Sequence, residues 1–213
     1  MDTIKSEKDY GVLIILAVIA SLILSLIKGV IGMFGRSESL QADGVYSFYL
    51  SYVFAKFIWL SKSNEESNQP KNNSCLYFTG LICGIITLFG WLDVFVFSIV
   101  RMFKVQEGTL CKPTPLAIFI SIISILVNYV LYRYILGINS KNETTGEMIN
   151  KDLINRLGLS ILFSSIVIVG VFIARYFSLY GDPVATLIIA ISIIPSITVL
   201  LKESVQKIKS IVL

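Results

Sequence analysis

Long apolar stretches alternate with short polar ones along this chain. An α-helix needs about 20 residues to cross the roughly 30 Å hydrocarbon core of a bilayer, and six stretches come close to or exceed this length. They cover residues 11–35, 40–60, 76–103, 116–136, 153–177 and 183–201. Backbone groups in lipid must be paired within their own segment, and membrane strands would alternate polar with apolar residues. The pattern therefore predicts an all-α membrane protein with six transmembrane helices.

Polar residues inside these stretches mark the positions of greatest interest, because each is costly in lipid unless it is paired. Asp43 begins the second stretch, and we expect it to cap its helix or to pair with a base such as Arg156. Lys28 lies near one end of the first stretch, so we expect it to reach the membrane surface. Asp182, directly before Pro183, is expected to cap its own helix. The remaining residues of this kind are Lys56, Asp93, Asn128, Ser160, Ser164 and Ser165.

Composition agrees with a membrane protein, since 55% of the residues are hydrophobic and 15% charged, against about 25% charged in soluble domains. Residues 1–10 are mixed in charge, and the apolar stretch after them exceeds the core of a signal peptide. We therefore expect a cytoplasmic tail at 1–10, a six-helix transmembrane domain at 11–201 and a short cytoplasmic tail at 202–213.

The basic residues predict the orientation, because cytoplasmic loops carry an excess of Lys and Arg. With the N-terminus inside, eleven fall on the cytoplasmic side and five opposite. The eleven are Lys5, Lys8, Lys62, Lys71, Arg133, Lys141, Lys151, Arg156, Lys202, Lys207 and Lys209, and the five are Arg36, Arg101, Lys104, Lys112 and Arg175. Both termini are thus expected in the cytoplasm. The net charge of +4 forms no single basic patch, so nucleic acid is not an expected partner.

Two function classes are disfavoured by the residues available. The chain contains no histidine, and its three cysteines form no CxxC pair, which excludes a structural zinc site of Cys and His. Without histidine or a recognisable catalytic motif we do not expect an enzyme. A channel would need rings of pore-lining polar residues, and the serines are scattered.

Three segments resemble the cation diffusion facilitator (cation efflux) transporters. Lys28, Gly29 and Gly32 lead to Ser39-Leu40 and Ala42-Asp43, Asn128 lies in the fourth stretch, and the sixth opens with Gly181-Asp182-Pro183. The resemblance implies a six-helix bundle that exports a divalent cation, such as zinc, iron or manganese, in exchange for protons. It also implies a homodimer or a heterodimer with a family member. The family's cytoplasmic metal-binding domain after the sixth helix is not seen in residues 202–213.

The resemblance also implies where a metal would bind. The family takes two ligands from its second helix and two from its fifth, each pair spaced i and i+4 so that both lie on one helix face. On this chain the first pair falls on Tyr46 and Leu50. The second falls on Arg156 and Ser160, or in another register on Ile154 and Gly158. The His and Asp ligands of the family are therefore absent, and Arg156 would repel a divalent cation.

Asp43 is the remaining candidate metal ligand. Residues that could line a site with it are Tyr46, Ser47, Leu50, Asn155, Arg156 and Ser160. Two hypotheses follow. The chain is a proton-coupled divalent-cation transporter with a degenerate site, or it is a transport-inactive family member that serves as partner subunit or scaffold. Either would lie in the cell membrane as a multi-pass protein, and usage rich in Ile, Lys and Asn suits a bacterial inner membrane.

Overall fold

A computed structural model describes residues 2–66, 74–108, 111–139 and 147–212 of the chain. Within these ranges it contains six α-helices and confirms the predicted all-α architecture. They are α1 (Asp2–Gly35), α2 (Glu38–Glu66), α3 (Ser74–Gln106), α4 (Leu116–Asn139), α5 (Glu147–Tyr176) and α6 (Gly181–Val212). Each of the six apolar stretches falls on one of these helices.

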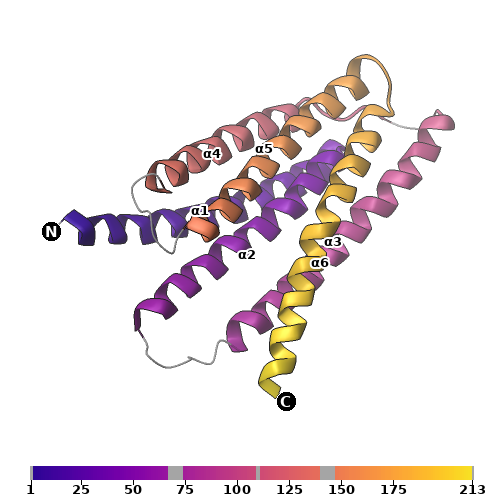
Figure 1. Cartoon of the computed structure of the whole chain (residues 1–213). Coiled ribbons are helices and arrows are strands. Elements are labelled where there is room, and N and C mark those ends of the chain that lie inside the picture. The colour runs from indigo at the N-terminus through magenta and orange to yellow at the C-terminus, as the bar shows by residue number, and fades with distance from the viewer. Residues whose placement is uncertain (1, 67–73, 109–110, 140–146, 213) are drawn as a thin grey trace.

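The helices form a splayed bundle of three neighbouring pairs (Figure 1). α3 packs with α6 on one side, α4 packs with α5 on the other, and α1 and α2 lie between them. The start of α1 and the end of α6 lie at the same end of the bundle, and the turn from α5 to α6 lies at the other (Figure 1). α2 contacts α1, α3, α5 and α6, so it is the helix most enclosed by protein.

Five of the six described helices are long and apolar enough to cross a membrane, and α2 is the exception. Its position explains the difference. A helix that faces protein on most sides can carry polar residues, whereas a helix that faces lipid cannot. α2 accordingly carries Asp43, Ser47 and Ser51, all of which are buried. The lower hydropathy of α2 therefore reflects a central place in the bundle.

The sixth helix is longer than its apolar stretch. α6 continues as one helix to Val212, so residues 202–212 extend it rather than forming a separate element. Lys56 of α2 forms an ion pair of 2.6 Å with Glu203 in this extension. The extension is thereby tied to the central helix at one end of the bundle.

Two places in the bundle depend on glycine because helices come very close. A Cβ added to Gly44 of α2 would lie 3.2 Å from both the Cβ of Lys28 and the backbone nitrogen of Gly29 on α1. The Ser25 hydroxyl donates to the Gly44 carbonyl at 2.9 Å. A Cβ on Gly170 of α5 would lie 2.3 Å from the Cβ of Ala185 on α6. Close approach of α1 to α2 is what lets a lysine of one helix reach an aspartate of the other.

Gly170 and Gly158 allow a matched test of this packing, since both lie on α5. We expect Gly170→Ala to lower the free energy of unfolding by about 1–3 kcal/mol, because the new methyl overlaps Ala185. Gly158 has nothing within 4 Å of an added Cβ, so Gly158→Ala should be neutral or stabilising by up to about 1 kcal/mol. Thermal unfolding in detergent measures both. Equal midpoints for the two variants would contradict the close α5–α6 contact.

Candidate functional site

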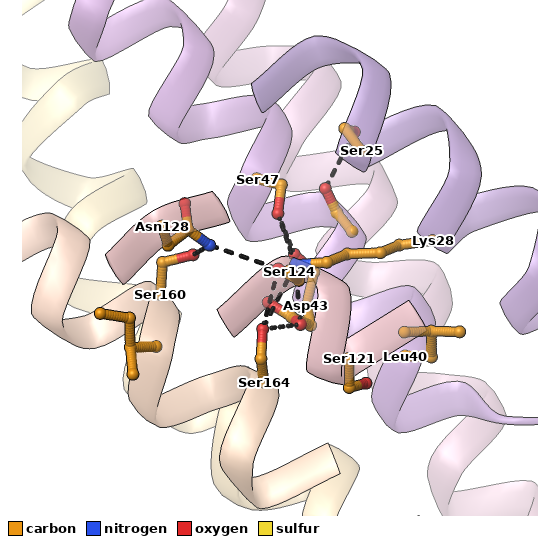
Figure 2. A network of polar contacts seen from close by, with 12 residues as sticks. Ser25, Lys28, Leu40, Asp43, Ser47, Ser121, Ser124, Asn128, Ser160 and Ser164 are labelled. Atoms are coloured by element: carbon orange, nitrogen blue, oxygen red, sulfur yellow. Dashed lines mark hydrogen bonds and ion pairs between the residues drawn. The ribbon is translucent and has the colours of Figure 1, made fainter. Parts of the chain in front are cut away.

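A buried ion pair joins α1 to α2 at the centre of the bundle. The ammonium of Lys28 lies 2.8 Å from Oδ2 of Asp43, and both side chains are 0% exposed (Figure 2). Three expectations about these residues are wrong. Lys28 does not extend to the membrane surface, and the base that pairs with Asp43 is Lys28 instead of Arg156. Asp43 also lies more than one turn after the start of α2 at Glu38, so it is not a capping residue.

Hydroxyl and amide groups from three helices surround this pair (Figure 2). The Lys28 ammonium donates to the Ser47 hydroxyl at 2.9 Å and contacts the Ser164 hydroxyl at 3.5 Å. Ser164 donates to Oδ2 of Asp43 at 2.7 Å. Next to it, Asn128 donates to Ser160 at 3.0 Å. We call this group the Asp43 cluster; its members are Lys28, Asp43, Ser47, Ser124, Asn128, Ser160 and Ser164, from α1, α2, α4 and α5.

One atom of the Asp43 cluster stands out chemically. Oδ1 of Asp43 is buried and has no hydrogen-bond partner within the described parts of the chain. A buried carboxylate oxygen normally accepts a hydrogen bond or binds a cation, because leaving it without either is costly. The cluster therefore offers an oxygen that a positively charged ligand could use.

Other interactions occupy the positions at which the family resemblance implies metal ligands. Tyr46 is fully buried, donates its hydroxyl to the Arg156 carbonyl at 3.1 Å, and packs its ring edge-on against Phe163. The Arg156 guanidinium pairs with Asp152 at 2.7 Å and contacts Tyr49. A phenol and a paired guanidinium are not ligands for a divalent cation. Within the described residues no group of three or more His, Cys, Asp or Glu side chains could hold a metal ion.

The remaining predicted site residues are spread over several environments. Leu50 is buried in an apolar core with Leu153 and Leu157. Asn155 is exposed on α5, whereas Ser160 is buried and bonded to Asn128. The structure thus brings Asp43, Ser47 and Ser160 into one cluster. It places Tyr46 beside Arg156, and it keeps Leu50 and Asn155 out of both groups. Ile154 packs against the core that holds Leu50, and Gly158 faces open space.

Lys28, Asn128 and Ser164 were singled out as polar residues within apolar stretches but were given no site role, and Ser124 was not singled out. A usable signal was present, because the polar residues occur as i and i+4 pairs on three helices. The pairs are Asp43 with Ser47, Ser124 with Asn128, and Ser160 with Ser164. This spacing places both members of a pair on one face, and polar faces of membrane helices turn toward each other.

A second buried polar group holds the start of α2. The Asp182 carboxylate accepts the Glu38 backbone N–H and the Ser37 hydroxyl, both at 2.9 Å, and also bonds the Ser39 hydroxyl. Arg101 on α3 lies 2.8 Å from the Glu38 carboxylate and 3.3 Å from Asp182. Asp182 was expected to serve its own helix, but its carboxylate satisfies the first N–H of α2. We call these five residues the turn cluster.

Asp93 belongs to neither cluster. It is exposed on α3 and lines a groove of about 510 Å³ beside the turn cluster, together with Arg36 and Lys104. It also lines an adjoining groove of about 240 Å³ between α1, α2 and α3, to which Gln41 contributes. Asp93 is therefore not a second carboxylate for the Asp43 cluster.

The Lys28–Asp43 pair should show the energetics of buried charges. Asp43→Leu and Lys28→Met each leave one buried charge without its partner, which should cost about 3–5 kcal/mol of unfolding free energy. The double variant Lys28→Met/Asp43→Leu should recover most of this loss. Lys56→Met is the control, because that pair is partly exposed and should cost about 0–1 kcal/mol. Unfolding in mixed micelles measures all four. Additive losses in the double variant would contradict the pairing.

Glu38 should make stability depend on pH. It precedes the apolar part of α2, and burial raises its pKa from 4.5 to about 7, against the attraction of Arg101 and with added repulsion from Asp182. Between these two values the folded chain binds more protons than the unfolded chain, so stability should fall as pH rises from about 4.5 to about 7. Glu38→Gln should flatten this part of the curve. Thermal midpoints of both proteins across this range measure it, and parallel curves would contradict the raised pKa.

Comparison with known proteins gives two matches. Residues 14–208 match the cation efflux transmembrane domain family. A protein of Methanocaldococcus jannaschii, described as an uncharacterized transporter, is 28% identical over 189 residues, which cover 84% of this chain and 63% of that relative. The chain thus spans less than two thirds of the relative's length. The six-helix architecture agrees with the match. The chain belongs to the cation efflux family and carries its transmembrane domain.

Proposed function

We propose that this protein transports a cation across the cell membrane and that Asp43 is the residue that binds it. The buried Oδ1 atom of Asp43 carries this proposal, since it has no hydrogen-bond partner in the described structure. Membership of the cation efflux family and the transporter relative support a cation as cargo. An ionisable residue buried in a membrane bundle commonly marks an ion pathway.

The Asp43 cluster differs in chemistry from the site that the family resemblance implies. The atoms that could bind a cation are the carboxylate oxygens of Asp43 and the serine hydroxyl oxygens, all of which are hard oxygen ligands. Zinc prefers nitrogen and sulfur ligands along with carboxylates, and neither histidine nor cysteine belongs to the cluster. The proposed transport site is therefore degenerate, because it lacks the His and Asp ligand set that the family resemblance implies. It favours a cation that accepts oxygen ligands.

Further parts of the proposed mechanism come from the family. By analogy with the family, we propose that the cation is exchanged for protons, that the protein forms a dimer, and that both termini lie on the cytoplasmic side. In the structure the Lys28 and Asp43 side chains are fully enclosed, so a transport cycle must open the cluster to each side in turn. The α4–α5 pair supplies Ser124, Asn128, Ser160 and Ser164, and movement of that pair relative to α1 and α2 would open it.

The alternative is a transport-inactive family member that acts as a partner subunit or scaffold. One observation favours it: the Lys28 ammonium already neutralises Asp43 at 2.8 Å in a site that is closed to solvent. On this alternative the ion pair would be purely structural, and Asp43 would bind no free cation.

Flux in liposomes separates the two functions. When a proton gradient is imposed, the purified protein should transport at least one of zinc, iron(II), manganese, sodium or potassium ions in exchange for protons. Asp43→Asn should reduce the rate of cation transport to that of empty liposomes. Asp93→Asn is the matched control, because its carboxylate lies on α3 outside the cluster and should leave the rate unchanged. Absence of flux for all five cations would support the inactive partner subunit. Equal flux in Asp43→Asn would place the site elsewhere.

A further inference from the structure

We infer that one polar face of α5 is the route by which a cation reaches Asp43, and that Arg156 closes this route through its contact with Tyr49 of α2. The inference rests on the proposed function, because the route leads to the carboxylate that the proposal assigns to the cation. Arg156 is then a gating residue and not a ligand. This gives a role to the guanidinium that stands where the family resemblance implies a metal ligand.

The polar face of α5 runs from an exposed part of the helix to the Asp43 cluster. Its members are Asp152, Arg156, Ser160 and Ser164. A spacing of four residues places them along one side of the helix. Their exposure falls in the same order: the Asp152 side chain is 57% exposed, that of Arg156 is 18% exposed, and both serines are 0% exposed. Since Ser164 donates to Oδ2 of Asp43 at 2.7 Å (Figure 2), a line of polar groups leads from the surface to the proposed cation site.

The exposed part of this face lies at the membrane surface. Lys151 and Asp152 are exposed near the start of α5, at the end of the bundle opposite the turn from α5 to α6 (Figure 1). Charged residues gather outside the hydrocarbon core, because a charge in lipid is costly. A cation in the surrounding water can therefore reach Asp152 without crossing lipid.

Arg156 and two tyrosines close the face one turn before the buried serines. The Arg156 guanidinium donates to the Tyr49 hydroxyl, and its Cζ atom lies 5.3 Å from the centroid of the Tyr49 ring. Tyr46 is fully buried and donates to the Arg156 carbonyl at 3.1 Å. These contacts join α2 to α5 between the exposed part of the face and the Asp43 cluster.

The guanidinium also acts on a cation through its charge. Arginine stays protonated in proteins, so Arg156 opens the route by moving and not by losing a proton. In its closed position its positive charge repels a cation, and the repulsion grows with the charge of that cation. A guanidinium released from Tyr49 keeps its 2.7 Å pairing with Asp152, which reaches the solvent. The charge that leaves the route therefore has both an acceptor and water to receive it.

Thiol labelling at the buried part of the face tests the inference and needs no transport. Ser160→Cys is introduced into the full chain after the three natural cysteines are replaced by alanine. Its reaction with aminoethyl methanethiosulfonate, a small cationic reagent, is followed by mass spectrometry in detergent. We expect a slow reaction while Arg156 and Tyr49 are unchanged. Tyr49→Phe and Arg156→Gln should each speed it by about tenfold or more, because each removes a hydrogen bond made by a charged group.

Ser121→Cys in the same background is the matched control. Ser121 is also 0% exposed and lies on α4, outside the polar face of α5, so its thiol should stay unreactive in every variant. Three results would overturn the inference: no gain at Ser160→Cys in either variant, an equal gain at Ser121→Cys, or fast reaction at Ser160→Cys before either change. An equal gain at both positions would mean that the whole fold has loosened and that no route has opened. If Arg156→Gln does not fold, Tyr49→Phe alone decides.

The liposome experiment reports separately on the proposed function. Labelling that responds as expected, in a protein that transports no cation, would overturn the proposed function and leave a gate on a closed polar cluster. Cation transport that depends on Asp43, without any gain in labelling, would keep the function and overturn the route.

Discussion

The pairing of Lys28 with Asp43 is the constraint on which the centre of this bundle depends. Two charges without solvent contact are tolerated only if they meet each other and if polar groups surround them, because removal from water costs several kcal/mol per ion. That requirement holds α1 close to α2 through Gly44, and it draws Ser164 of α5 and, through Ser164, Ser124 of α4 inward. Four helices thereby share one polar centre, which a purely apolar bundle would not need.

The two buried polar groups serve different purposes. In the turn cluster the Asp182 carboxylate accepts bonds from a backbone N–H and two hydroxyls and also meets Arg101, so this acid is satisfied and holds the start of α2. In the Asp43 cluster one carboxylate oxygen accepts no bond from the described residues. The turn cluster also contains a carboxylate oxygen without a hydrogen-bond partner among the described residues, Oε2 of Glu38, so incomplete pairing alone does not separate the two clusters. The candidate site is placed at Asp43 because this carboxylate lies at the centre of the bundle among polar side chains of four helices (Figure 2).

The helices could be predicted from the sequence, whereas the site could be predicted only in part. The six apolar stretches were placed on the correct helices because each must span a bilayer, and that length requirement acts on every stretch independently. Asp43 was recognised as important because a carboxylate within such a stretch is costly. Its partner was misassigned, since the choice between Lys28 and Arg156 depends on which helix faces lie together. Asp182 was misassigned for the same reason, because its carboxylate accepts a hydrogen bond from the first N–H of α2 and does not cap its own helix.

The sequence by itself determined that the chain is an all-α membrane protein of six helices, and it pointed to a family whose ligand set is missing at Tyr46, Leu50, Arg156 and Ser160. Hydropathy and spacing along one chain are local properties, so they can be read without coordinates. Only the tertiary structure decided that Lys28 neutralises Asp43 and that serines of α2, α4 and α5 surround the pair. Those contacts join residues up to 136 positions apart, and close packing of helix faces, rather than any local pattern, brings such residues together.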